Sequence, residues 1–205
     1  MYYIDRGLVK QNARSAIRAN YWPIIGWSLL GEVILTACGC IPAVGWIAAI
    51  FIAPVVSAGL CYFSYKLYCG ENAGSAELFA GFNDFIHIVG GIWWMYLFSF
   101  LWSLLFVIPG VIKGISYSMT PFILIDRPDV GARDALKLSM EMTRGHKWEI
   151  FKMYLSFIGW GILTALTGGI LAVFYTGPYM NITLAGYYYE LKAMYESSAR
   201  EETEE

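Results

Sequence analysis

Glu32 is the one carboxylate that lies well inside a long apolar run of this sequence, residues 21–40. Inserting an ionisable side chain into a membrane costs at least about 2.5 to 3.5 kcal/mol, so such a residue by default indicates a function. Lys113, just past a turn between two other apolar runs, could reach a similar depth and pair with it. With the hydroxyls of Ser118 and Thr120, these residues form a candidate intramembrane polar site. The alternative is that Glu32 is protonated or hydrogen-bonded between helices and only assists packing.

The remaining reactive side chains predict neither catalysis nor metal binding. The sequence contains no recognisable set of Ser, His and acid, no phosphate-binding loop and no pair of intramembrane carboxylates. Cys38 and Cys40 are separated by one residue, a spacing that suits neither a zinc site nor a disulfide, and His87 and His146 are far away in sequence. We therefore expect a protein that is not an enzyme and that has no metal and no cofactor.

The composition indicates which elements must position these residues. Of the 205 residues, 58% are hydrophobic and 15% are charged, and the mean hydropathy is +0.51. A soluble domain does not need so much apolar surface. A membrane-spanning helix needs about 20 mostly apolar residues, and six runs approach that length: 21–40, 43–65, 88–108, 109–125, 150–169 and 171–189. The sequence thus predicts an all-α membrane protein with about six transmembrane helices.

The six runs pair into three hairpins with common features. The returning helix of each hairpin contains a proline, at Pro54, Pro121 and Pro178. Proline lacks the backbone N–H and breaks or kinks a helix, so these are expected helix-break positions. A segment with amphipathic helical spacing precedes each hairpin, at residues 1–20, 71–87 and 130–144. We expect these segments to form helices at the cytoplasmic membrane surface, although the first would also be stable as a solvated helix.

The third surface helix offers a candidate docking surface. Arg133, Lys137 and Arg144 lie on its mixed-charge side, opposite an apolar stripe, and Gly145 is placed to end it in a left-handed conformation. Such a stripe is more often used for packing than for binding a ligand.

Weak internal similarity suggests three copies of one unit. We expect residues 1–195 to form a single polytopic domain, with units at 8–69, 75–126 and 129–193; for example, Trp27-Ser28-Leu29-Leu30 recurs as Trp102-Ser103-Leu104-Leu105. Chance convergence of apolar sequence is the alternative. Residues 196–205 are rich in glutamate and are expected to be a disordered acidic tail.

The charges predict the topology. Of the 14 Lys and Arg residues, only Lys113 falls near a turn that we place outside the cell. The positive-inside rule then puts both termini in the cytoplasm. The 14 basic residues are balanced by 16 acidic ones, so the lipid bilayer is an expected partner and nucleic acid is not.

Several motifs carry a family resemblance, among them Trp102-Ser103-Leu104-Leu105, Ile108-Pro109-Gly110, Tyr117-Ser118-Met119, Gly145-His146-Lys147-Trp148 and Pro178-Tyr179. Over nearly its whole length the sequence resembles the bacterial integral membrane family catalogued as domain of unknown function 975. The resemblance implies a multi-pass protein of the bacterial cell membrane with no established activity or site. More distantly, the sequence is similar to the membrane domain of some glycerophosphodiester phosphodiesterases, but no hydrolase domain is recognisable in it.

Two classes of function remain open. The first is a transporter or channel-like component that conducts a small solute or lipid along a polar path between the proline-broken helices. The second is an interaction or assembly protein whose surface helices dock a partner protein or a second copy. A continuous polar cavity at Glu32, Ser118 and Thr120 would favour the first. A solid apolar core with a patch on residues 130–144 would favour the second.

Overall fold

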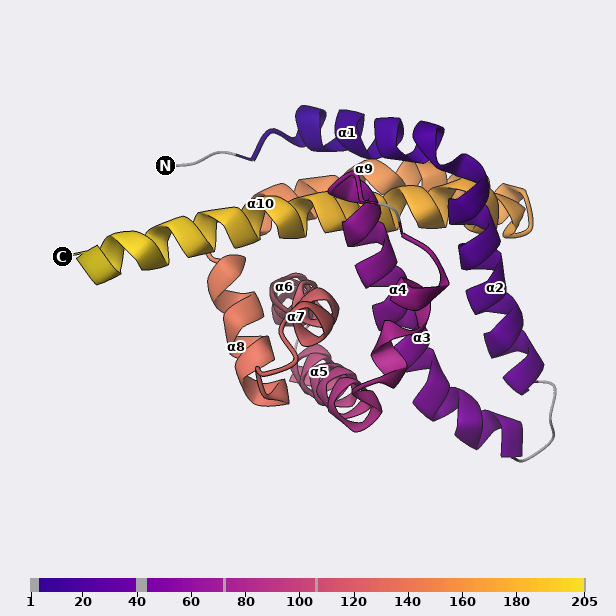
Figure 1. Ribbon diagram of the computed structural model, residues 1–205, viewed down its shortest axis with the longest axis horizontal. Coiled ribbons are helices and arrows are strands. Elements are labelled where there is room, and N and C mark those ends of the chain that lie inside the picture. The colour runs from indigo at the N-terminus through magenta and orange to yellow at the C-terminus, as the bar shows by residue number, and fades with distance from the viewer. Residues whose placement is uncertain (1–3, 40–43, 72, 106, 205) are drawn as a thin grey trace.

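The computed structural model describes residues 4–39, 44–71, 73–105 and 107–204, and all regular secondary structure within these ranges is helical. Figure 1 shows the arrangement of the helices. The first four elements are α1 (Arg6–Ala19), α2 (Tyr21–Gly39), α3 (Val44–Tyr68) and α4 (Ser75–Phe79), followed by the 3₁₀ turn η1 (Ala80–Phe82). The remainder are α5 (Phe85–Leu105), α6 (Val107–Tyr117), α7 (Thr120–Asp126), α8 (Ala132–Met142), α9 (Lys147–Leu166), the π-helix η2 (Ala172–Thr176) and α10 (Gly177–Glu204).

Four helical stretches within the described ranges have the length and apolar composition needed to cross a membrane: Ala48–Tyr68, Phe85–Leu104, Ile108–Asp126 and Lys147–Leu166. The third of them combines α6 and α7. The prediction of an all-helical protein with several membrane-compatible helices is therefore confirmed, but the six-helix bundle of hairpins is not. In Figure 1, α5, α6 and α7 are seen nearly end-on, whereas α9 and α10 lie across the view, so the apolar helices do not share one direction.

Helix α1 is the amphipathic helix that the sequence predicts at residues 1–20. Its apolar stripe of Val9, Ala13 and Ile17 is buried, and α1 lies along α10 (Figure 1). Close approach is possible because Gly186 of α10 has no side chain, since a Cβ there would lie 2.8 Å from Val9 Cγ1. The apolar face of this helix thus packs on protein.

The basic face of α1 also contacts protein. The ammonium of Lys10 donates a hydrogen bond to Ser156 Oγ and lies 4.9 Å from the ring centroid of Phe157, both on α9. Arg14 Nε donates a hydrogen bond of 3.1 Å to the hydroxyl of Tyr179 on α10. Two of the cations that we expected to face lipid headgroups therefore hold α1 against α9 and α10.

The second amphipathic segment is shorter than the sequence suggests. Helix α4 and the turn η1 pack on α3, where Leu78 is fully buried. The contact is so close that a Cβ on Gly59 would lie 2.0 Å from the carbonyl oxygen of Leu78. Because Gly59 lies in the middle of the candidate span Ala48–Tyr68, this segment covers the side of α3.

The three predicted helix-break prolines have different roles. Pro54 lies inside the continuous helix α3. Pro121 occupies the first turn of α7, directly after the break that separates α7 from α6. Pro178 is the second residue of α10 and follows the π-helix η2. Only Pro121 therefore starts a helix, as expected for a residue whose missing N–H has no partner in the first turn. Pro178 lies within a helical stretch that runs from residue 170 to 204 and directly follows its π-helical turn.

The third amphipathic segment and the C-terminal residues differ from expectation at their ends. Helix α8 begins only at Ala132, with Gly131 as its N-cap, and ends at Met142. Gly145 has a φ of +89°, the left-handed conformation that was predicted for it. Residues 196–204, which we expected to be disordered, continue α10 as far as Glu204. Alanine, arginine and glutamate are good helix formers, so a polar composition alone does not stop this helix.

The three proposed repeat units have the same order of elements. Each contains a helix with an amphipathic sequence followed by two apolar helical segments. The triplication itself stays a prediction.

Candidate functional site

The hydroxyls expected to line a polar path lie near the junction of α6, α7 and α8, where Ser118 is half-buried and Thr120 is buried. Ser118 Oγ donates a hydrogen bond of 2.7 Å to the carbonyl of Ile115. The hydroxyl of Ser139, on α8, donates a 2.7 Å bond to the carbonyl of Ser116. Thr120 is fully buried, and its hydroxyl has no hydrogen-bond partner within the described ranges. The hydroxyl of Ser118, which was predicted, and that of Ser139, which was not, thus bond backbone carbonyls at the end of α6.

Glu32 and Lys113 do not come together. Glu32 is exposed on α2, which packs on one side of α3. Lys113 is on α6, and α7, the helix that follows α6, contacts α3 from another side (Figure 1). The ammonium of Lys113 lies 5.0 Å from the ring centroid of Trp102 and 3.6 Å from Met140 Sδ. Since Met140 belongs to α8, Lys113 lies on the same side of the molecule as the mixed-charge helix that we expected at the cytoplasmic surface.

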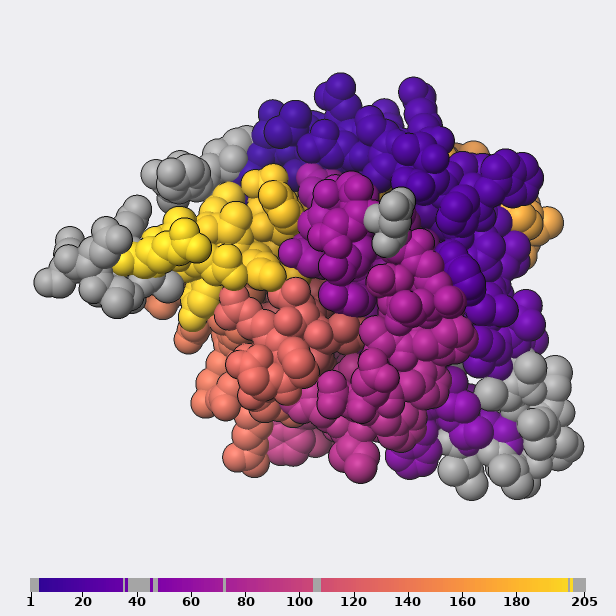
Figure 2. All heavy atoms as spheres, in the orientation of Figure 1, coloured from indigo at the N-terminus to yellow at the C-terminus, as the bar shows by residue number. Residues whose placement is uncertain are grey.

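Arg133 and Lys137 share a surface groove on α8. The guanidinium of Arg133 lies 5.0 Å from the ring centroid of Trp94 on α5, and Lys137 pairs with Asp134 at 3.0 Å. On the face drawn in Figure 2, the side chains of α8 lie directly beside those of α5. The groove, called the α8 groove below, has a volume of about 370 Å³ and is lined by Trp94, Phe98, Tyr117, Arg133, Leu136, Lys137 and Met140.

Arg144 does not join this surface. It lines a separate depression of about 170 Å³ between the end of α8 and α10, together with Glu141 and His146. The predicted docking surface is therefore divided, and only Arg133 and Lys137 act together.

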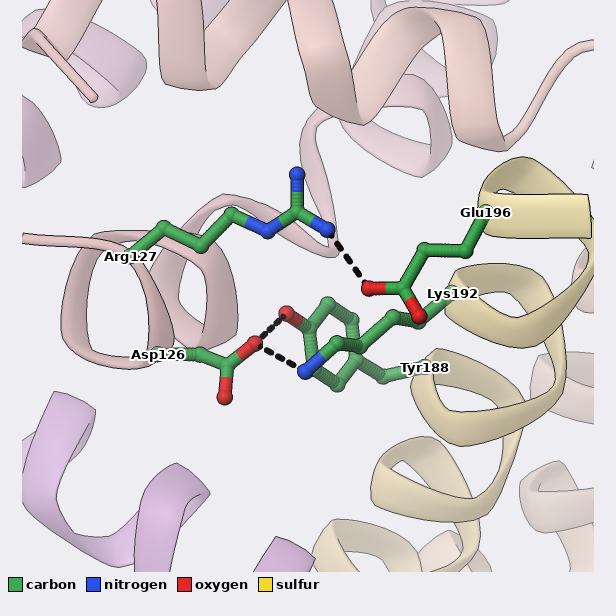
Figure 3. Close-up of polar contacts among 5 residues, drawn as sticks. All are labelled: Asp126, Arg127, Tyr188, Lys192 and Glu196. Atoms are coloured by element: carbon green, nitrogen blue, oxygen red, sulfur yellow. Dashed lines mark hydrogen bonds and ion pairs between the residues drawn. The ribbon is translucent and has the colours of Figure 1, made fainter. Parts of the chain in front are cut away.

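A polar cluster between α7 and α10 was not predicted. Asp126 Oδ2 accepts hydrogen bonds of 2.7 Å from both the Tyr188 hydroxyl and the Lys192 ammonium (Figure 3). Beside this pair, Arg127 Nη2 lies 2.8 Å from Glu196 Oε1. These residues fix α10 to the end of α7, and we call them the α7–α10 clamp.

The sequence contains a signal for this clamp. Tyr188, Lys192 and Glu196 are spaced by four and lie on one face of a helix. Asp126 and Arg127 follow an apolar run directly. What the spacing could not provide is the pairing of the two segments, which are more than 60 residues apart.

The geometry gives the clamp a structural role. The ring of Tyr188 stacks on Phe122 with centroids 5.1 Å apart and meets Tyr65 edge-on at 5.2 Å. Its hydroxyl is already bonded to Asp126. Within the described ranges, no group of three or more His, Cys, Asp or Glu side chains could hold a metal ion. The absence of catalysis stays a prediction.

Comparison with known proteins identifies one family. The family model described as "Protein of unknown function (DUF975)" matches residues 92–195, from α5 into α10. No curated protein and no solved structure matches the chain. The expected resemblance to this family is confirmed, while the distant similarity to a phosphodiesterase membrane domain stays a prediction.

Proposed function

The chain belongs to the DUF975 family of proteins of unknown function, and we propose from its own geometry that it is a membrane-embedded interaction protein. In this proposal the α8 groove docks a segment of a partner protein that combines an acidic residue with an apolar anchor. The single observation that carries the proposal is the groove itself, where two cations flank an aromatic and aliphatic floor.

The chemistry of the groove supports an acidic occupant. Arg133 and Lys137 are both exposed, and arginine next to tryptophan is typical of residues that dominate binding energy at protein interfaces. The pair between Lys137 and Asp134 is exposed on both sides, at 68% and 66%. Such a pair is worth about 0 to 1 kcal/mol, so a carboxylate on a partner can replace Asp134 at little cost.

The placement of the polar residues gives less support to a transporter. A conduction path needs polar groups that line a continuous cavity. Thr120 is fully buried, and Glu32 is on the exposed side of a different helix.

We also propose that the chain crosses the bacterial cell membrane several times with both termini in the cytoplasm. In this topology α2 and the first half of α10 would also lie in the membrane. Labelling of single cysteines placed at Ser75 and Gly168 with a membrane-impermeant maleimide in whole cells tests this topology. The proposal expects labelling at 168 and none at 75, and the reverse pattern would contradict it.

Site-specific photo-crosslinking in cells tests the docking function. Phe98 lines the groove, so p-benzoylphenylalanine at this position keeps an aromatic ring there. Phe100 lies on the same helix, is 65% exposed and is not among the residues that line the groove, which makes it the matched control position. We expect a discrete protein adduct from position 98 and none from position 100.

Charge reversal makes the crosslinking test specific. The double variant Arg133→Glu/Lys137→Glu should abolish the adduct at position 98, and the crosslinked protein should carry an acidic segment at the site of attachment. An adduct that survives charge reversal, an adduct with lipid alone, or an adduct with a second copy of this chain would overturn the proposal of a partner protein.

A further inference from the structure

A second groove lies between α6 and α9, away from the one used above. It has a volume of about 540 Å³, within the range of about 300 to 1,000 Å³ that is usual for small-molecule sites. Four aliphatic side chains of α6 form one wall, and Trp148 and Phe151 of α9 form the other. The aliphatic residues are Ile108, Val111, Ile112 and Ile115. The groove is open, because Ile108 and Trp148 are 75% and 66% exposed.

Cations lie close to one another beside this groove. Among the described residues that line it, Lys147 is the one that carries a charge, and it lies within electrostatic range of Lys113 and Arg144. Within the described ranges, none of the three forms an ion pair with a carboxylate. Glu149, in the first turn of α9, is engaged by His146 at 3.1 Å. Lys147 is therefore repelled by both neighbouring cations. Glu141 lines the same depression as Arg144 but forms no ion pair with it in the part of the chain that the structure describes.

We propose that this groove binds an anionic phospholipid. The phosphate of the headgroup lies between Lys113 and Lys147, with Arg144 nearby, and one acyl chain lies along the isoleucines of α6. Charge complementarity selects this occupant, because basic pockets between membrane helices are suited to anionic headgroups. A soluble anion would not use the apolar walls, which are almost free of polar surface.

The surroundings match the depth at which headgroups lie. Trp148 lines the groove, and Trp102 lies under the ammonium of Lys113. Tryptophan is enriched at the interface between membrane and water. The Lys113 ammonium lies over this indole, and lysine side chains near a membrane surface hold their charge at the level of the headgroups. In the proposal the three cations face the phosphate layer.

Native mass spectrometry of the full-length purified protein tests this site. The protein in detergent micelles is titrated with phosphatidylglycerol and, separately, with phosphatidylcholine of the same acyl chains. We expect phosphatidylglycerol adducts to persist at collision energies that remove phosphatidylcholine. A cation near a headgroup contributes about 1 kcal/mol, so Lys113→Gln/Lys147→Gln should reduce retention of phosphatidylglycerol about tenfold or more.

Two further variants separate the headgroup from the chain. Ile112→Trp fills the groove without changing its charge and should also reduce retention. Arg6→Gln/Arg200→Gln removes the same two charges from exposed positions on α1 and α10 and should leave retention unchanged, while size-exclusion elution verifies folding. Equal retention of the two lipids, an equal loss in Arg6→Gln/Arg200→Gln, or displacement of phosphatidylglycerol by soluble glycerol phosphate would overturn the proposal.

Discussion

The indole Nε1 of Trp93 on α5 donates a hydrogen bond of 3.2 Å to the carbonyl oxygen of Ile50 on α3. Ile50 lies four residues before Pro54, which is inside α3 and has no backbone N–H. The carbonyl of Ile50 therefore has no helical partner. In an apolar environment an unsatisfied carbonyl is costly, so Trp93 compensates across the helix interface for the defect that Pro54 creates.

This relationship predicts a specific coupling between Trp93 and Pro54. Trp93→Phe should lower the free energy of unfolding by about 1 to 3 kcal/mol, the cost of leaving a polar group unpaired. In the Pro54→Ala variant the backbone N–H of residue 54 can donate to the carbonyl of Ile50. Trp93→Phe should therefore lower the free energy of unfolding clearly less in that variant. Unfolding of all four proteins in mixed detergent micelles measures the coupling as a double-mutant cycle. Additive effects would show that the indole does not serve the proline.

Gly59 is expected to tolerate no side chain. Gly59→Ala would place a Cβ 2.0 Å from the carbonyl oxygen of Leu78, which forces α4 away from α3. We expect a loss of about 2 kcal/mol or more in the free energy of unfolding. Gly90→Ala on α5 is the matched control, because no atom lies within 4 Å of its added Cβ. That substitution should be neutral or slightly stabilising, since alanine favours helix. Similar losses in both variants would contradict this packing.

Lys10 predicts a pH dependence of stability. Burial, and then the charges of Arg6 and Arg14, lower the pKa of Lys10 from its ordinary value of 10.5. The unfolded chain therefore binds this proton more tightly than the folded protein. The free energy of unfolding should rise as pH increases from the lowered pKa to 10.5, because in this range the unfolded chain still binds the proton that the folded protein has lost. Above 10.5 the Lys10 side chain is deprotonated in both states and the rise ends.

The variant Lys10→Met should remove this part of the pH dependence. Thermal unfolding in detergent at a series of alkaline pH values gives the slope for each protein. Lys137→Met is the control, because that side chain is 68% exposed. If Lys10→Met and the unaltered protein have the same slope, burial of Lys10 does not couple to folding.

Local chemistry explains which features were predictable. The left-handed conformation of Gly145 and the helix start at Pro121 follow from the residues themselves and from their neighbours in sequence. The amphipathic stripe of α1 is equally local. The surface on which α1 packs is not determined locally, because its apolar residues recur every 3.6 residues whether they face lipid or another helix.

The positions of Lys113 and Asp126 depend on tertiary packing. We assigned Lys113 to the outer surface because it follows a turn, whereas it contacts Met140 through the approach of α8 to α6. Asp126 was not predicted to pair with Lys192, which is 66 residues later. No local rule links segments that are so far apart. The predicted polar site was therefore dispersed, and the α7–α10 clamp was missed.

The clamp should derive its stability from one of its two ion pairs. The side chains of Asp126 and Lys192 are 14% and 23% exposed, whereas those of Arg127 and Glu196 are 29% and 42% exposed. Asp126→Asn should lower the free energy of unfolding by about 1 to 3 kcal/mol, because it leaves the half-buried ammonium of Lys192 without its counter-charge. Glu196→Gln should cost at most about 1 kcal/mol, as is usual for exposed pairs. Limited proteolysis should cut α10 of the Asp126→Asn protein faster than that of Glu196→Gln. Equal cleavage rates and equal unfolding energies would show that Asp126 does not hold α10 in place.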